Sequence, residues 1–198
     1  MKIYEKNPID SKDVRVFKGL KGKEKERFVR IEIEGIAKEY AVSNYGRVFD
    51  VETSTELQKR SLTKSDPSYK IVRLKTIKDG KARYNSYAVN VLVANAFVKK
   101  SKKDIELKRK IVHPIDWDAS NSRYSNLQWV SSVELSIMKS INDGQTEIVD
   151  FVRYACILMS HGYSDKDIKA VLDMPIKGFI AKIRKREIYP EICSKYNY

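Results

Sequence analysis

The stretch from Val112 to Leu135 holds the side chains that are best suited to chemistry. Its sequence, VHPIDWDASNSRYSNLQWVSSVEL, gathers an imidazole, carboxylates and side-chain amides in a short span. Such groups can transfer protons and bind hard metal ions. A structural zinc site is not indicated, because the cysteines and histidines are scattered without the spacing of zinc ligands. They are Cys156, Cys193, His113 and His161.

The charge of the chain favours a polyanionic partner. The sequence has 39 basic and 26 acidic residues, which gives a net charge of +13 over 198 residues. A protein with this excess repels itself, and nucleic acid is the partner that most often offsets such charge. A basic solubilising surface, or attachment to ribosomes or anionic membranes, is the alternative. With 42% apolar residues the chain can bury a core, so wholesale disorder is not expected.

The sequence shows no targeting signal. It has no run of about 18 apolar residues, so we expect no membrane span and no membrane partner. The N-terminal sequence MKIYEKNPIDSKDVRVF lacks an apolar signal core. Cys156 and Cys193 form no CxxC pair and lie in apolar helical contexts. Buried thiols in a reducing cytoplasm are the expectation.

The first third of the chain predicts strands after a polar, lysine-rich lead-in over residues 1–27. Residues 28–34, FVRIEIE, alternate apolar and charged side chains, which is typical of a half-buried strand. A short strand at 40–42 and another at 47–49 flank the sequence SNYG. The glycine of this turn can adopt the positive φ that a tight reversal needs.

A polar connection over residues 51–68 leads to a second hairpin. Strands at 69–76 and 82–89 flank Asp79 and Gly80, and Asp-Gly between alternating runs is a strong hairpin signal. A basic, aromatic-bearing face of this hairpin could lie on a phosphate backbone, although a merely solvated face is equally compatible. The predicted contacts are Lys70, Arg73, Lys75 and Arg83.

A helix is predicted over residues 90–98, with Asn90 as its cap. Residues 99–110, KKSKKDIELKRK, carry seven basic and two acidic side chains. We expect a flexible loop suited to phosphate contact, although charge runs are often only solvated. The predicted contacts are Lys99, Lys100, Lys102 and Lys103. Strands at 111–113 and 127–130 and a helix at 132–142 complete this part.

The last fifty or so residues predict three helices. The first is capped by Thr146 and ends at His161, and the second begins with a capping box at Ser164. After a turn at 173–175, the third carries a basic side. A helix-turn-helix module that reads duplex DNA fits this pattern, and a three-helix module that binds a protein is the alternative. The basic residues are Lys177, Lys182, Arg184, Lys185 and Arg186.

Several of these segments together resemble the HNH homing endonucleases of phages and introns. The sequence YAVSNYGRV at 40–48 is similar to their N-terminal motif, Tyr-x-Val-Ser-Asn-x-Gly-Arg-Val. Residues 69–97 resemble the next part, whose helix usually opens His-Arg-Leu-Val-Ala-x-Ala-Phe. Residues 112–129 resemble the core motif, and the C-terminal helices fit the DNA-binding tail of many members. The match covers about residues 30–190.

The resemblance implies a ββα unit that grips one divalent ion, of the His-Me finger type. In the family, an acidic or amide residue beside the core His and an Asn on the following helix bind the metal. The His is the general base, and the Asn before Leu-x-Trp orients it. Phosphodiester cleavage needs both an activated nucleophile and a cation on the developing charge.

A gapless alignment backwards from Asn126-Leu127-Gln128-Trp129 places the catalytic His position at Pro114 and the second metal ligand at Leu135. Proline cannot accept a proton, and leucine offers no oxygen to a hard cation. The other aligned positions bear less directly on whether the catalytic groups are present. Asp116, Asn121 and Arg123 match the family, His113 falls on the metal-binding position before the His, Trp117 replaces a turn Gly, and Asn90 replaces the His of the earlier helix.

We therefore expect a sequence-specific binder of double-stranded DNA that has lost cleavage and acts as a transcriptional regulator, repressor or site blocker. It would be a monomer or weak dimer in the cytoplasm, that of the host if phage-encoded, and would need no cofactor. The first alternative is an active endonuclease or nickase with Mg²⁺ or Mn²⁺, using His113 and Asn126 for catalysis and His113 and Asp116 for the metal. The second is a non-enzymatic structural or interaction protein.

The expected fold class is α+β. A small antiparallel sheet and an HNH-like ββα unit would be followed by a three-helix helix-turn-helix domain. The expected domains are the lead-in at 1–27, an endonuclease-like domain at 28–142 and a DNA-binding domain at 145–198. The second of these contains the motif at 38–50 and the ββα core at about 82–142. Arg47 and Arg123 complete the predicted DNA contacts.

Overall fold

The computed structural model describes residues 26–62, 68–144, 146–173 and 178–198, and these form two compact units. The first contains the described residues up to Lys99 together with Val112–Trp129, and the second contains Lys100–Ile111 and Val130–Tyr198. This division differs from the expected boundary near residue 142. Of the predicted lead-in at 1–27, only Glu26 and Arg27 lie within the described residues.

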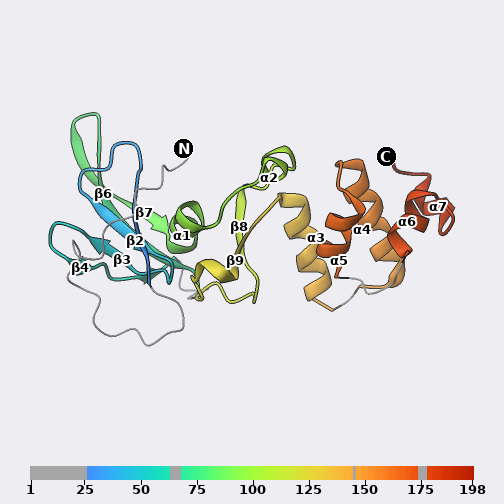
Figure 1. The fold of residues 1–198 in the computed structure, drawn as a ribbon, viewed down its shortest axis with the longest axis horizontal. Helices are drawn as coiled ribbons and strands as arrows, with labels where there is room; N and C mark the ends of the chain where they lie inside the picture. The colour runs from blue at the N-terminus through green and yellow to red at the C-terminus, as the bar shows by residue number, and fades with distance from the viewer. Residues whose placement is uncertain (1–25, 63–67, 145, 174–177) are drawn as a thin grey trace. The chain divides into compact units, whose positions relative to one another are not determined.

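The first unit begins with a four-stranded antiparallel sheet in the order β1-β2-β3-β4 (Figure 1). Its strands are β1 (Phe28–Arg30), β2 (Tyr40–Ser43), β3 (Val48–Asp50) and β4 (Thr55–Glu56). The predicted strand over 28–34 is shorter than expected, since ladder pairing ends at Arg30. The predicted turn between β2 and β3 is present, and Gly46 has a φ of 79° there.

A second sheet contains β5 (Arg60–Ser61), β6 (Lys70–Lys78) and β7 (Lys81–Ala88), in that order. The predicted hairpin is confirmed. Asp79 and Gly80 both have positive φ, 52° and 71°, which is the backbone of a two-residue turn matched to the twist of the strands. The region predicted as a polar connection, 51–68, contains the short strands β4 and β5 in addition.

Gly35 joins the two sheets. Its carbonyl accepts a 2.6 Å hydrogen bond from the Ile77 amide, and the Ala37 amide donates to the Lys75 carbonyl at 2.9 Å. A Cβ atom at Gly35 would stand 2.7 Å from the Ile77 carbonyl oxygen, and the residue has a φ of 74°. Both facts require glycine, because a side chain would clash and would strain the backbone.

Helix α1 (Val89–Phe97) follows directly from β7 and covers the core of the first unit (Figure 1). The prediction that Asn90 caps it is wrong. The helix begins after Ala88 without a side-chain cap, and Asn90 lies in its first turn, 3% exposed. Strands β8 (Ile111–Pro114) and β9 (Leu127–Val130) pair with each other, and a short 3₁₀ helix, η1 (Tyr124–Asn126), precedes β9.

The second unit consists of helices packed around an apolar core. They are α2 (Lys102–Glu106), α3 (Ser132–Asn142), α4 (Ile148–Ser160), α5 (Asp165–Leu172), α6 (Phe179–Arg184) and α7 (Pro190–Cys193). The prediction of a flexible loop over 99–110 is wrong, because Ser101 and Asp104 form a capping box that starts α2. The ββα unit expected over 82–142 is divided, since β8 and β9 lie mainly in the first unit and α3 in the second.

The predicted helix starts of the second unit are partly correct. The capping box at Ser164 is present, with Asp167 as its acidic partner. Thr146 is not the cap of α4. Glu147 takes that position, and the Thr146 hydroxyl donates to the Ser140 carbonyl at 2.9 Å. The turn predicted at 173–175 lies outside the described residues except for Asp173.

Both cysteines are buried free thiols in the helical core, as the sequence indicated. The described parts of the chain contain no helix that is long and apolar enough to cross a membrane. The mixture of small antiparallel sheets with separate helices confirms the α+β class.

Candidate functional site

The carboxylate of Asp116 lies at the centre of a hydrogen-bonded loop between β8 and β9. Its Oδ1 accepts from Asn126 Nδ2 at 2.8 Å and from the Asp118 amide at 2.9 Å. Its Oδ2 accepts from Asn121 Nδ2 at 2.7 Å. The Asp116 amide donates in return to Asn126 Oδ1 at 3.1 Å. The hydrogen bonds from Asn121 and Asn126 lower the pKa of Asp116, with burial opposing them, so the group is held as a carboxylate.

This network uses two residues that the family resemblance assigns to catalysis. Asp116 was predicted, with His113, as a metal ligand of an active enzyme, and Asn126 as the residue that orients the base. In the structure the two bond to each other and to Asn121, and they close the loop. A hard cation at Asp116 would have to compete with two amide donors on Oδ1 and a third on Oδ2.

His113 is buried beside a tight reversal of the chain. Its side chain is 8% exposed, and its ring meets that of Trp117 edge to face at a centroid distance of 4.5 Å. The Trp117 amide donates to the Pro114 carbonyl at 3.3 Å, and Trp117 has a φ of 64°. Left-handed backbone is uncommon for a bulky residue, which explains why glycine is usual at this position in the resembled motif.

Leu135, at the predicted position of the second metal ligand, lies on α3 in the second unit. Its neighbour Glu134 is 2% exposed and is bound by Arg109, whose Nη2 lies 2.6 Å from Oε1. Arg109 also contacts Asp104 at 2.8 Å. Burial alone would lower the pKa of Arg109, but the hydrogen bonds to Glu134 and Asp104 raise it. Glu134 therefore serves the fold of the second unit.

These residues do not fit a catalytic divalent cation. Pro114 and Leu135 have no donor atom at the positions where the family places the base and a ligand, and Asp116 is engaged with amides. Within the ranges that the structure describes, no three side chains of His, Cys, Asp or Glu gather as a metal site.

The β2–β3 turn packs against the same loop. A Cβ atom at Gly46 would stand 2.5 Å from Ser122 Cβ, so the contact requires glycine. The Tyr124 amide donates to the Asn44 carbonyl at 2.9 Å, and the Arg27 amide donates to Asn44 Oδ1 at 2.8 Å. The motif at 40–48 therefore supports the 115–126 loop directly.

Two arginine–tyrosine stacks lie at this junction. Arg123 Cζ lies 4.9 Å from the ring centroid of Tyr45, and Arg27 Cζ lies 5.6 Å from that of Tyr124. The sequence predicted Arg123 as a DNA contact but missed Arg27 and Tyr45. No local pattern could have found these two, because the contacts join segments that are distant in the sequence. Asn90 adds a further tie, donating from Nδ2 to the Ala119 carbonyl at 3.1 Å.

The β6–β7 hairpin separates its predicted cations between two faces. Arg73 pairs with Ser86 and Lys75 with Tyr84, so these side chains share the face opposite the buried Val72 and Leu74. We call Arg73, Lys75 and Tyr84 the hairpin face. Arg73 Cζ lies 5.8 Å from the Tyr84 ring centroid, and Tyr84 is 58% exposed.

The remaining predicted cations of the hairpin lie elsewhere. Arg83 pairs with Thr76 and Lys70 with Ser61, so register places both on the side of the core, although Arg83 itself is exposed. Lys70 Nζ donates to Ser61 Oγ at 3.5 Å. Lys78 and Lys81, which were not among the predicted contacts, are exposed beside the Asp79-Gly80 turn. Their position next to that turn was the signal that could have identified them.

Arg47 is engaged within the first unit. Its Nη1 lies 3.1 Å from Glu26 and its Nε lies 3.0 Å from Glu56, while its guanidinium stacks on Phe49 at 4.8 Å. Only 21% of the side chain is exposed. These contacts favour a role in joining strands over the predicted contact with DNA.

The predicted cations of the second unit differ in their surroundings. Lys103 forms an ion pair with Asp167 and donates to Ser164 Oγ at 3.1 Å. Arg184 donates to Asp165 at 2.6 Å and to the Tyr163 carbonyl at 3.2 Å. Arg186 donates to the Tyr196 carbonyl at 3.3 Å. Exposed positions are held by Lys100, Lys102, Lys182 and Lys185, as by Lys99 in the first unit, and Lys177 lies outside the described residues.

Comparison with known proteins supports the resemblance. Residues 29–75, about a quarter of the chain, match the NUMOD4 motif, which occurs in HNH homing endonucleases. A solved structure that concerns DNA binding and cleavage by the HNH homing endonuclease I-HmuI is 23% identical, with a TM-score of 0.41. The alignment covers 61% of this chain and 62% of that one, so this likeness carries no inference by itself. No curated protein matches the chain.

The matched residues include the whole of the four-stranded sheet after Phe28, the Gly46 turn and most of β6. They therefore contain the turn that supports the 115–126 loop and two members of the hairpin face, Arg73 and Lys75. The NUMOD4 motif confirms the similarity to HNH homing endonucleases that the sequence indicated.

Proposed function

We propose that this protein binds double-stranded DNA as a relative of HNH homing endonucleases and no longer cleaves it. The hairpin face is the observation that carries the DNA-binding part. Arg73 and Lys75 are placed side by side with an exposed aromatic ring, and neither forms an ion pair with a described residue. An antiparallel two-stranded ribbon fits the major groove of B-DNA, so cations on its outer face can reach phosphates or base edges.

The second unit supplies the other half of the proposed interface. Helices α5 and α6 would act as a helix-turn-helix, with α6 entering the groove. The apolar side chains Ile168, Leu172, Phe179 and Ile183 of these helices are buried in the unit's core. Lys182 and Lys185 remain exposed on and after α6, where phosphate or base contacts are possible.

The proposed loss of cleavage rests on Pro114 and Asp116. A general base must accept a proton from the attacking water, and proline has no group that can do so. The only carboxylate matched to the metal site holds three amide donors. What the stretch retains is a closed loop, docked on the Gly46 turn, that carries Arg123 at its surface.

A binder without cleavage is suited to occupy a DNA site. The consequence is steric, because bound protein excludes other proteins from the same duplex. We therefore propose a regulatory use, as a repressor or as a blocker of another DNA-acting protein. Two linked modules would give higher effective affinity than either alone.

The test combines site capture with a cleavage assay. The full chain is incubated with fragmented genomic DNA and 5 to about 10 mM Mg²⁺ or Mn²⁺, a range chosen to saturate weak cation sites as well. Retained fragments are then sequenced for both a common site and new ends. We expect an enriched site with intact strands. Because about 6 to 10 phosphate contacts are expected, affinity should fall by several decades from low to moderate salt.

Two results would contradict this function. Binding that barely depends on salt would show that the protein does not contact phosphates, and the proposed function requires those contacts. Strand breaks at the enriched site that disappear in a His113→Ala variant would assign the protein to the active nucleases, with His113 as the base. A matched Asn121→Ala variant, which loosens the loop without removing an imidazole, separates catalysis from folding.

A further inference from the structure

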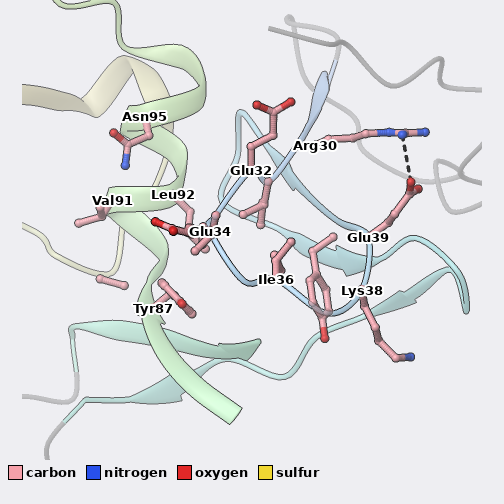
Figure 2. Close-up of a pocket in the computed structure, with 14 residues that line it drawn as sticks. Arg30, Glu32, Glu34, Ile36, Lys38, Glu39, Tyr87, Val91, Leu92 and Asn95 are labelled. Atoms are coloured by element: carbon pink, nitrogen blue, oxygen red, sulfur yellow. Dashed lines mark hydrogen bonds and ion pairs between the residues drawn. The ribbon is translucent and has the colours of Figure 1, made fainter. Parts of the chain in front are cut away.

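The first unit contains an apolar groove that the proposed DNA interface does not use. Its volume is about 740 Å³, and it lies between the segment of residues 30–40 and helix α1 (Figure 2). The walls of the groove are mainly apolar. Their side chains include Ile31, Ile33, Ile36, Tyr87, Val91 and Leu92. Neither Arg73 nor Lys75 of the hairpin face lines this groove.

The rim of the groove is acidic on a strongly basic protein. Glu32 and Glu34 are exposed, and Figure 2 shows both at the side that faces α1. Neither forms an ion pair with any residue in the described ranges. The two cations of the rim are already neutralised: Arg30 lies 3.1 Å from Glu39, and Lys38 lies 3.1 Å from Asp50. An anionic ligand such as DNA would be repelled here.

One wall of the groove begins at the outer edge of a sheet, because Arg30, the last residue of β1, lines it. Strand β1 is the first strand in its sheet, with β2 on one side and no strand of the described residues on the other. The Ile31 amide donates to the Tyr40 carbonyl at 2.8 Å and so points towards β2. Because backbone groups alternate in direction along a strand, those of Arg30, the last residue of β1, point outward. Such an edge can pair with an added strand.

The opposite wall offers a polar group without a partner. Asn95 lies on α1 and lines the groove, and its Nδ2 atom is buried with no hydrogen-bond acceptor in the described structure. A buried donor of this kind is costly unless an acceptor reaches it. A carbonyl oxygen of a bound chain would supply that acceptor.

We propose that this groove binds an extended peptide of a partner protein by strand addition to β1. The peptide would alternate apolar side chains with lysine or arginine. Its backbone pairs with the outward groups of Arg30 at the end of β1, its apolar side chains enter the groove, and its cations meet Glu32 and Glu34. Strand addition combines backbone hydrogen bonds with pockets for alternate side chains, which is the chemistry that this groove presents.

The probe for this site is a fluorescent octapeptide that alternates valine with lysine and arginine. Its anisotropy is titrated with the full chain, and a peptide that alternates valine with glutamate is the control. We expect saturable binding of the basic peptide only. The double variant Glu32→Lys/Glu34→Lys should weaken it by about tenfold or more, because like charges then face each other.

A matched variant separates this local effect from net charge. Glu106→Lys/Glu191→Lys makes the same change of charge at exposed positions of the second unit and should leave the dissociation constant unchanged. Asn95→Leu removes the amide donor and should weaken binding of the basic peptide by a few-fold. Circular dichroism confirms that the variant folds. Equal binding of the acidic peptide, or no effect of the changes at Glu32 and Glu34, would overturn the proposal.

The chain itself contains a competing sequence of the same chemistry. Residues 14–18, VRVFK, combine three apolar with two basic side chains. A full-length Val14→Asp/Val16→Asp variant tests whether this segment occupies the groove. Unchanged affinity for the basic peptide supports an external partner. Tighter binding of the peptide would show that the chain's own segment competes for the groove, and it would overturn the proposal of a partner protein. The proposed DNA binding does not depend on this outcome, because the groove and the hairpin face share no residue.

Discussion

The hairpin face and the segment of residues 99–110 look alike in sequence and differ in structure. Both are rich in lysine and arginine, and both were predicted to contact phosphate. On the hairpin face, Arg73 and Lys75 form no ion pair with a described residue. In the segment, Lys103 pairs with Asp167 and Arg109 with Asp104 and Glu134. The first can be used for a partner, whereas much of the second holds its own unit together.

The difference arises from where the acidic partners lie in the sequence. Asp104 is close to Arg109, but Glu134 and Asp167 come from α3 and α5. Helix formation over Lys102–Glu106 positions the cations of the segment towards these carboxylates. The hairpin face has a tyrosine and a serine opposite its cations instead. A run of basic residues therefore predicts a binding surface only when the fold brings no carboxylates to it.

The largest effect should come from Arg109. In an Arg109→Met variant, Glu134 would remain 2% exposed without its guanidinium partner. Breaking a buried pair by removing one charge typically costs about 3 to 5 kcal/mol, and the partial exposure of Arg109 favours the lower end. We expect the free energy of unfolding of the second unit to fall by about 3 kcal/mol. Guanidinium denaturation followed by far-ultraviolet circular dichroism measures it.

Lys110→Met is the matched control for that change. Lys110 is an exposed cation in the same segment, and no ion pair with a described residue involves it. Its removal alters net charge equally but should shift stability by less than about 0.5 kcal/mol. Similar losses in the two variants would break the distinction between paired and solvated cations in this segment.

Acid should weaken the ion pairs that hold the second unit together. Burial by itself would raise the pKa of Asp104 and of Asp167, but hydrogen bonds from Arg109 and from Lys103, respectively, hold both below their ordinary value. A carboxyl whose folded pKa is lowered stabilises the protein above its unfolded pKa, and that contribution disappears as the pH falls through the folded pKa. Stability should therefore decline below about pH 4.

The Arg109→Met variant sharpens this expectation. Without the guanidinium, the pKa of Asp104 should return towards its ordinary value, so the variant should lose less stability between about pH 5 and pH 3 than the native chain. Denaturation midpoints measured across that range report the difference. Parallel curves for the two proteins would show that Asp104 takes its lowered pKa from elsewhere.

The sequence predicted the local features of the fold and missed those that depend on distant contacts. The Asp79-Gly80 hairpin, the Gly46 turn and the Ser164 capping box follow from turn and cap chemistry within a few residues, and all are present. Asn90 was taken for a helix cap by the same reasoning. It instead bonds the Ala119 carbonyl, a partner that no local pattern reveals.

The candidate site shows the same limit. The alignment placed Pro114 and Leu135 at the catalytic positions, which required only the sequence. It could not show that Asp116 would be held by Asn121 and Asn126, since that depends on how the loop closes. Nor could residue type show that Arg83 lies on the opposite face from Arg73, because a strand register decides it.

Substitutions on the hairpin face should lower DNA affinity without lowering the stability of the fold. An Arg73→Ala/Lys75→Ala variant should bind the captured duplex about tenfold more weakly at low salt, and the slope of log affinity against log salt should become shallower by about two. Arg83→Ala is the comparison, since register places it on the side of the core. Gel shift at several salt concentrations measures both. If Arg83→Ala lowered DNA affinity more than the double variant did, the DNA interface would lie on the opposite face of the hairpin.

The smallest effects should distinguish Lys102 from Lys103, two adjacent cations of α2. Lys103 pairs with Asp167, and its side chain is 44% exposed, so screening limits the loss of stability in Lys103→Met to less than about 1 kcal/mol. The DNA affinity of Lys103→Met should hardly change.

Lys102 is exposed and has no ion pair with a described residue. Lys102→Met should therefore leave stability unaltered and weaken DNA binding about twofold if the segment touches phosphate. If Lys103→Met weakens DNA binding as much as Lys102→Met, the ion pair with Asp167 does not withhold Lys103 from DNA. The contrast between the hairpin face and this segment would then rest on Arg109 alone.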